Sequence, residues 1–294
     1  MHNADAHGDA DPPVLTGLDP LLPPQMARRA EEIGVAKANG SWINTLVLSV
    51  LAGAFIALGA QFFTMATTDS DMGYGLTRLV GGLTFSLGLF LVVVAGAELF
   101  TGNNLIVMAW ASRRISSLHL LRNWAIVYAG NFAGALATVA LVYASKQWEF
   151  AGSDVGANAL RIADNKVDLG FTEAIALGIL CNGLVCLAVW LAYSARSNTD
   201  KFLAVIFPIT AFVASGFEHS IANMYFIPMG LLLKERDGVT QAAALADGDL
   251  SNLTAGDFLL NNLLPVTIGN IIGGALLVGA IYWFIYLRPG VRQP

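Results

Sequence analysis

Charge is what this sequence has least of. Only 13% of its 294 residues are charged, against the ~25% that is usual in soluble domains, while 55% are hydrophobic and the mean hydropathy is +0.61. This composition excludes an ordinary soluble domain and predicts an all-α integral membrane protein whose surroundings are a lipid bilayer. The net charge of -5 and the lack of any basic run exclude a nucleic-acid partner.

Cysteine and histidine are also scarce, with two and four copies. Cys181 and Cys186 lie inside an apolar stretch without metal-ligand spacing, which indicates free, buried thiols. Of the histidines, only His219 lies in an apolar stretch. A membrane-embedded enzyme would need clustered ligands or catalytic groups within its apolar stretches. We therefore expect no enzyme, no metal site and no cofactor.

The first 40 residues are polar and contain five prolines, and they lack the apolar core of a signal peptide. The sequence predicts a cytoplasmic N-terminal tail over residues 1–40 that carries a short amphipathic helix at 24–39. A channel domain is expected over residues 41–288, and a cytoplasmic C-terminal tail over 289–294.

Six apolar stretches follow the tail, at about 42–66, 76–110, 118–145, 171–195, 202–233 and 258–287. Each is long enough to cross a membrane core of about 30 Å at ~1.5 Å per helical residue. The second and fifth are too long for one straight helix, and both contain a glycine-rich segment with a carboxylate in its middle. We therefore predict six transmembrane helices, with spans 2 and 5 broken.

The distribution of basic residues predicts the orientation. Ten lie in the tails and the loops on one side, against six on the other, where acidic residues accompany them. Because cytoplasmic loops carry an excess of Lys and Arg, both termini of this multi-pass protein are expected in the cytoplasm.

The two halves of the chain share a pattern of Glu and Asn. A Glu is followed by an Asn five positions later in the second and fifth stretches, and two Asn stand eight positions apart in the third and sixth: Glu98/Asn103, Glu218/Asn223, Asn123/Asn131 and Asn262/Asn270. Residues of about 41–146 and 170–288 therefore form two repeats of three spans. Because each repeat has an odd number of crossings, the repeats must be inverted, and paired glycine-interrupted spans are typical of a transport site.

The two breaks suggest an anion path. A helix that begins within the membrane exposes free N–H groups and a positive dipole end, which attract a small anion. An intramembrane carboxylate is normally paired or hydrogen-bonded. We therefore interpret Glu98 and Glu218 as scaffold, bonded to the N–H groups of their own breaks or to an asparagine such as Asn182. Direct contact with the permeant is the alternative.

His219 stands in one break, at the position that Leu99 occupies in the other. A buried histidine is often only a core residue, but at this place imidazole can donate a hydrogen bond to an anion, or a proton near neutral pH. Thr101 in the matching break can bond His219, the permeant or its own helix backbone.

Several large apolar side chains in the same stretches are candidates for constrictions that exclude hydrated ions, with ordinary packing as the alternative: Phe85, Leu89, Leu99, Phe100, Val185 and Phe212. A neutral-solute pore of the aquaporin type is the nearest rival function. Such a pore would show paired Asn-Pro-Ala breaks, and the sequence has none.

Four long segments resemble the signature segments of the formate–nitrite transporter family. They are LVGGLTFSLGLFLVVVAGAELFTGN at 79–103, CNGLVCLAVWLAYSARS at 181–197, FVASGFEHSIANMYFIPMG at 212–230 and NLLPVTIGNIIGGALLVG at 262–279. The similarity runs from about Leu21 to Arg288. The sequence Ile-Pro-Met at 227–229 is most similar to that of the formate channels of the family.

This resemblance implies an aquaporin-like fold, a homopentamer with one pore per protomer, and a place in the bacterial inner membrane. It implies passive, bidirectional passage of formate, with a proton accompanying uptake at low pH. It also implies a gating role for the N-terminal helix and a cytoplasmic formate-producing lyase as partner. A nitrite or hydrosulfide channel of the same family remains the alternative, because all three anions are small and singly charged.

The resemblance also implies roles for single residues. His219 and Thr101 match the central pair, and Asn182 and Asn270 match pore-side asparagines. The narrow parts of the pore are matched by apolar residues: Leu89 and Leu99 at the centre and the cytoplasmic side, with Phe100 and Val185 nearby, and Phe85 and Phe212 at the periplasmic side. Lys166 matches a lysine that attracts anions in the outer vestibule.

Overall fold

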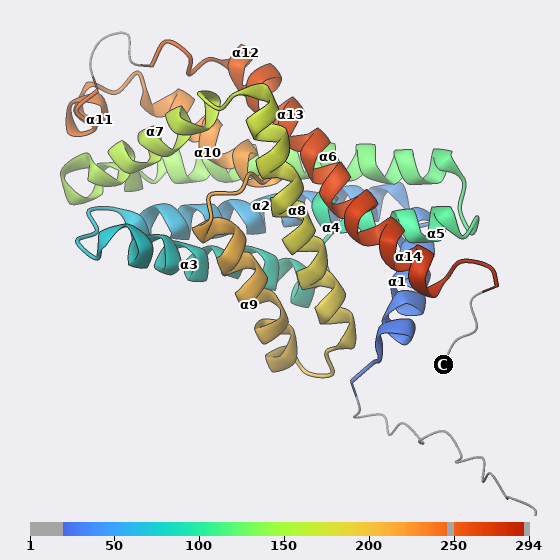
Figure 1. Cartoon of the computed structure of the whole chain (residues 1–294). Coiled ribbons are helices and arrows are strands. Elements are labelled where there is room, and N and C mark those ends of the chain that lie inside the picture. Colours follow the sequence, from blue (N-terminus) through green and yellow to red (C-terminus); the bar gives the residue numbers. More distant parts are fainter. Residues whose placement is uncertain (1–19, 246–249, 291–294) are drawn as a thin grey trace, which may run out of the picture.

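The computed structural model describes residues 20–245 and 250–290, and within these ranges it contains helices and turns but no strand. The predicted N-terminal tail therefore lies outside the described residues up to position 19, and so do the last four residues. The chain begins with α1 (Pro23–Ala38), which lies with α14 (Ile281–Tyr286) at one end of the molecule, while α7 (Asp154–Val167) and α11 (Asp237–Ala242) lie at the other end (Figure 1).

Five helical stretches of the described residues are long and apolar enough to cross a membrane. Four are single helices: α2 (Trp42–Thr67), α3 (Gly73–Ala95), α6 (Ser117–Ala144) and α8 (Phe171–Ser194). The fifth runs from Ala255 to Tyr286 through α12 (Ala255–Asp257), η3 (Phe258–Leu263), α13 (Leu264–Ile271), η4 (Ile272–Ala280) and α14. The stretch expected at 202–233 is divided between α9 (Asn198–Ala214) and the shorter apolar helix α10 (Ser220–Leu233).

The helical path is interrupted at two matching places. Helix α3 ends at Ala95, and α4 (Phe100–Asn103) begins after a four-residue gap before continuing into η1 (Asn104–Ile106) and α5 (Val107–Ala111). Helix α9 ends at Ala214, and α10 begins at Ser220. The glycine after each helix, Gly96 or Gly216, has a positive φ of 77° or 75°. That left-handed conformation ends a helix and is open to glycine at little steric cost.

The segment between the third and fourth apolar stretches is folded as well. It forms η2 (Gln147–Ser153) and α7, whose buried face includes Val155 and Leu160 and packs on α10. Because α7 is too polar overall to count as a span, the hydropathy pattern of the sequence did not indicate this helix.

Close packing between helices depends on glycines that face a neighbouring backbone. A Cβ at Gly134 of α6 would lie 1.9 Å from the carbonyl oxygen of Val50 on α2, and one at Gly273 would lie 2.2 Å from that of Ile179 on α8. Small residues allow such approach between apolar helices, whose association depends on van der Waals contact. The contact of α2 with α6 and that of α8 with α13 and η4 therefore occupy corresponding places in the two halves.

We expect Gly134→Ala to lower the free energy of unfolding by about 1–3 kcal/mol, because the added methyl group forces α6 away from α2. The matched control is Gly183→Ala on α8, where an added Cβ meets no atom within 4 Å. Thermal unfolding of the detergent-solubilised protein measures both. Equal midpoints for Gly134→Ala and wild type would contradict the packing argument.

Candidate functional site

Two cavities enter the molecule and share no lining residue. The first, the α1 cavity, has a volume of about 250 Å³ and is lined by α1, the end of α3 and the residues around Glu98. The second, the α7 cavity, has a volume of about 270 Å³ and is lined by α7, the start of α3 and the residues around Glu218. Leu99 lines the first and His219 the second, so each helix break forms the wall of one cavity.

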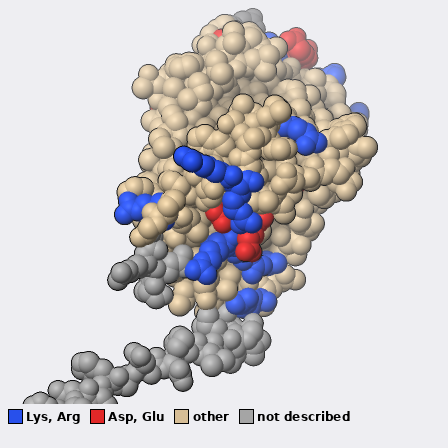
Figure 2. All heavy atoms as spheres, turned by 90° about the vertical axis from the view of Figure 1, so that its right-hand side faces the viewer, with Lys and Arg blue, Asp and Glu red and all other residues tan. Residues whose placement is uncertain are grey.

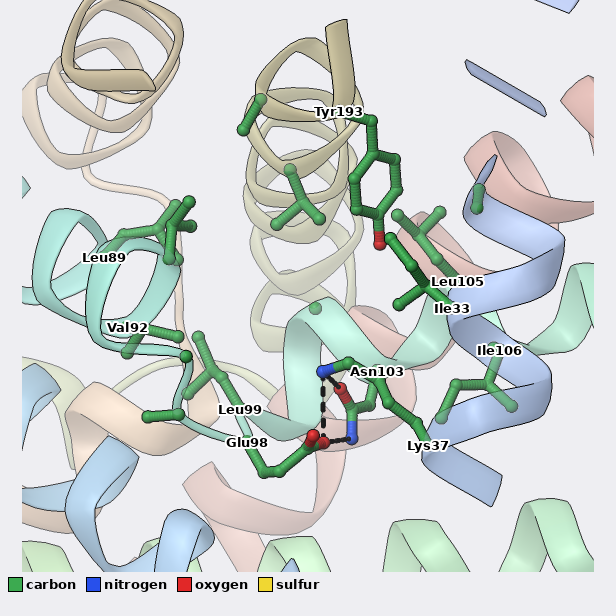
Figure 3. Close-up of a pocket in the computed structure, with 18 of the residues that line it drawn as sticks. Ile33, Lys37, Leu89, Val92, Glu98, Leu99, Asn103, Leu105, Ile106 and Tyr193 are labelled. Carbon is green, nitrogen blue, oxygen red and sulfur yellow. Dashed lines mark hydrogen bonds and ion pairs between the residues drawn. The ribbon is translucent and has the colours of Figure 1, made fainter. Parts of the chain in front are cut away.

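In the α1 cavity a lysine from α1 neutralises the carboxylate of the first break. The Lys37 Nζ lies 3.1 Å from Glu98 Oε2 and 2.8 Å from Asn103 Oδ1, and Asn103 Nδ2 donates to the same carboxylate oxygen at 2.6 Å (Figure 3). Asn103 also donates to Asn123 Oδ1 at 3.0 Å. The carboxylate is thus held by a charge-assisted network.

The α7 cavity holds the same network with a different lysine. Lys166 Nζ, on α7, lies 2.6 Å from Glu218 Oε1, and Asn223 Nδ2 donates to Glu218 Oε2 at 2.6 Å and to Asn262 Oδ1 at 2.7 Å. The paired Glu and Asn of the sequence repeat therefore meet in space in both halves. The proposed hydrogen bonds between these carboxylates and the N–H groups of their own breaks are not present; the breaks are held in another way.

Two asparagines hold the breaks. Asn131 Oδ1 accepts from the backbone N–H of Phe100 at 2.9 Å, and Asn270 Oδ1 accepts from that of Ser220 at 2.9 Å. Each side-chain amide donates to two backbone carbonyls, one of them that of Glu98 or Glu218. The first N–H group of each helix is therefore already bonded. The sequence analysis expected this group to be free for an anion, and it is not.

The side chains of Asn182 and Asn270 are fully buried and line neither cavity. Asn182 donates to the carbonyl of Thr101, to that of Asn270 and to Asn104 Oδ1, at 3.3, 2.6 and 3.1 Å. The amides of both asparagines bond the backbone of the breaks, and their place beside the pore stays a prediction.

His219 and Thr101 lie between the cavities. The His219 Nε2 is 3.0 Å from Thr101 Oγ1, and both side chains are buried. His219 is also the N-cap of α10, because its Nδ1 accepts from the backbone N–H of Ala222 at 3.1 Å. A backbone N–H is only a donor, so Nδ1 carries no proton and the ring is the neutral Nε2–H tautomer. The N-terminus of α10 therefore sets the tautomer of His219.

Aromatic and aliphatic side chains surround this pair. The rings of Phe85 and Phe212 meet edge-to-face with centroids 5.6 Å apart in the α7 cavity, and Phe212 stacks on His219 at 5.9 Å. On the other side, Leu89 and Leu99 line the α1 cavity.

Phe100 and Val185 are also buried but line neither cavity. The Phe100 ring packs instead against Trp124 and Tyr128.

Three residues at the cavities escaped the sequence analysis. Lys37 and Arg78 counted there only as loop charges, and Tyr193 was not considered, although its hydroxyl points into the α1 cavity (Figure 3). Lys37 corresponds to Lys166 of the other half, because each lies five residues before α2 or α8 and its carbonyl accepts from the repeated Asn123 or Asn262. The pattern of Glu and Asn that defined the repeat did not include these lysines. At the end of the molecule where α1 lies, Lys and Arg side chains surround a small cluster of Asp and Glu side chains (Figure 2).

Comparisons with known proteins agree with this geometry. A model of the family described as "Formate/nitrite transporter" matches residues 24–284. The formate channel FocA of Escherichia coli (strain K12) is 50% identical over 274 residues, which cover 92% of this chain and 96% of that protein. The formate channel FocA of Haemophilus influenzae is 41% identical over 268 residues, covering 90% and 94%.

Two solved structures are also similar. One, described as "Pentameric formate channel with formate bound", has a TM-score of 0.79 and 45% identity, and the match covers 84% of this chain and 98% of that one. The other, described as "FNT family ion channel", has a TM-score of 0.74 and 28% identity, with coverage of 88% and 98%.

We expect Asn270→Ala to destabilise the protein by about 3 kcal/mol, because three hydrogen bonds are lost and buried backbone groups are left without partners. The matched control is Asn261→Ala, since Asn261 is exposed and donates only to Asp257. Thermal unfolding in detergent measures both. A change for Asn270→Ala no larger than that of the control would show that the break does not depend on this amide.

Proposed function

The chain belongs to the formate/nitrite transporter family, and from this premise we propose that it is a passive, bidirectional channel for formate. Membership in this family makes it a membrane transport protein and not an enzyme. The single observation that carries the proposal is the His219–Thr101 pair, buried between two cavities that approach it from opposite ends.

We propose that the chain crosses the membrane six times as two inverted, aquaporin-like repeats. In this reading, α3 with α4 and α5 forms one broken span, and α9 with α10 forms the other. The matching asparagine and carboxylate contacts of the two breaks support it. Irregular backbone is tolerated at membrane depth only where protein encloses it or where it lines a cavity, and both conditions apply here.

The wall chemistry suits a small anion better than a neutral solute. Both carboxylates are neutralised by lysines, so they do not repel an anion. The Nε2–H of His219 donates to Thr101 or, when formate arrives, to a carboxylate oxygen. If it donates to Thr101, the hydroxyl hydrogen of Thr101 is free to bond the permeant, and such chains of hydrogen bonds strengthen one another. Glu98 and Glu218 then serve as scaffold.

We propose that the α1 cavity opens to the cytoplasm of a bacterial inner membrane and that Lys166 belongs to the outer vestibule. Both termini are then cytoplasmic, which cysteine labelling in sealed vesicles tests.

A homopentamer with one pore per protomer is the proposed assembly, and light scattering in mild detergent gives its subunit number. A formate-producing lyase that binds α1 is the proposed partner, which co-purification with and without residues 1–38 tests.

Proton-coupled uptake at low pH is a further part of this proposal, and the tautomer of His219 constrains it. To deliver a proton as imidazolium, the ring must first be protonated at Nδ1. That nitrogen then no longer accepts the Ala222 N–H, so protonation competes with the helix cap. Formate and imidazolium are both charged, and both are disfavoured away from water relative to neutral formic acid and imidazole.

Proteoliposomes containing the wild-type protein should pass formate in either direction along its gradient, without ATP or an ion gradient. Parallel measurements with nitrite, hydrosulfide and glycerol decide among the alternatives, with empty liposomes as control. Faster passage of nitrite or hydrosulfide would indicate another anion of the same family. Faster passage of glycerol would indicate a neutral-solute pore and overturn the proposal.

His219→Asn should keep an open pore but remove the pH dependence of formate flux, because Asn can cap α10 yet has no titrating group. For an unperturbed histidine the protonated fraction falls about 30-fold between pH 5 and 8, so proton-coupled formate flux through the wild type should fall as the pH rises over this range. His219→Phe removes the cap as well, and His119→Asn changes a histidine away from both cavities. If formate flux through His219→Asn depends on pH as it does in the wild type, His219 does not transfer the proton.

A further inference from the structure

Arg78 lies on the first turns of α3 and lines the α7 cavity. Its guanidinium spans to the end of α9, where Nη2 donates to the carbonyl of Val213 at 2.6 Å and Nε donates to that of Ala214 at 3.2 Å. The group also lies over the ring of Phe63, with 5.8 Å between the guanidinium carbon and the ring centroid. One edge of the guanidinium is therefore fixed against the second helix break.

Gly216 makes room for this arrangement. A Cβ built on Gly216 would lie 3.3 Å from Arg78 Nη2, and the φ of 75° already disfavours other residues. The guanidinium thus sits directly against the break that leads to His219, three residues further along the chain.

Arg78 carries the unbalanced charge of this cavity. Three charged residues line it: Arg78, Lys166 and Glu218. Lys166 and Glu218 form an ion pair and cancel each other. Within the described parts of the chain, no carboxylate forms an ion pair with Arg78. The α7 cavity therefore has one net positive charge, and Arg78 supplies it.

The fixed geometry leaves a second edge of the guanidinium unused. A guanidinium has five N–H donors in a rigid fork, and Nε and Nη2 share the edge that is bound to the two carbonyls. No described residue accepts a hydrogen bond from Nη1. The edge formed by Nη1 and the remaining Nη2 hydrogen matches the two oxygens of a planar anion.

We propose that this free edge of Arg78 is the capture site of the α7 cavity, which binds a planar anion with two oxygens, such as formate or nitrite, before it reaches His219. The inference rests on the proposed channel function and goes beyond it, because it names a residue that discriminates among anions. Hydrosulfide has a single accepting atom and gains only the charge of Arg78, without the two-point contact. The competing role is structural: Arg78 only caps the free carbonyls at the end of α9.

The test compares Arg78→Lys, which keeps the charge without the fork, with Arg78→Gln, which removes the charge. Lys146→Gln is the matched control, because it removes a cation that is paired with Glu149 and does not line the α7 cavity. Flux of formate, nitrite and hydrosulfide is measured at low ionic strength in right-side-out and inverted membrane vesicles. Size-exclusion profiles and melting temperatures accompany each variant.

Arg78→Gln should raise the half-saturating formate concentration about tenfold from the side of the α7 cavity, with little change from the other side. Arg78→Lys should raise it about threefold for formate and nitrite and leave that of hydrosulfide within about twofold, because a lysine is a point charge and not a fork. Lys146→Gln should behave as the wild type. If Arg78→Gln does not assemble, the anion comparison in Arg78→Lys still decides.

Equal half-saturation in Arg78→Lys and wild type for all three anions would overturn the proposal. Lower melting temperature without a change in half-saturation would do the same and leave Arg78 as a helix cap. An effect that Lys146→Gln reproduces, or one that is equal from both sides, would show a general surface field in place of a site. A wild-type protein that passes no formate would instead overturn the proposed function, and this inference with it.

Discussion

Polar groups at the two helix breaks must find partners inside the protein, and the rest of the structure depends on this constraint. The breaks are buried in the protein, where little water reaches an N–H, a carbonyl or a carboxylate. Asn131 and Asn270 bond the backbone of the breaks, and a Lys–Glu–Asn network beside each break neutralises its carboxylate. The repeated Glu and Asn of the sequence are the parts of this solution that the two halves share.

The two halves differ where their functions differ. At the position of Leu99 in the first break stands His219 in the second, and the latter both caps α10 and contacts Thr101 across the molecule. Their lysines, by contrast, correspond: Lys37 and Lys166 each lie five residues before the first long helix of their half, α2 or α8, and each pairs with the carboxylate of that half. A common frame thus holds two different cavities.

Pairing with lysines leaves neither cavity wall with an unpaired carboxylate. In the proposed function, the donors at the second break are the ring N–H of His219, the hydroxyl of Thr101 and the free edge of Arg78, while Arg29, Lys201 and Tyr193 line the α1 cavity. Apolar rings and leucines fill the space between them, so a bare ion has few other partners to replace its water.

The sequence by itself determined the apolar all-helical class, the family and the glycine-rich positions at which helices α3 and α9 end. It also determined the Glu and Asn pairs, because a repeat within one chain is visible without coordinates. Only the tertiary structure decided which lysine pairs with Glu98 and which with Glu218, and that Asn182 and Asn270 bond the backbone. Only the structure shows that the N–H of Ala222 sets the tautomer of His219 and that Arg78 lines the α7 cavity. The lysine, asparagine and arginine contacts join residues far apart in the chain, so the local sequence pattern carries no signal for them. The cap of His219 depends on where α10 begins, which the local pattern does not show either.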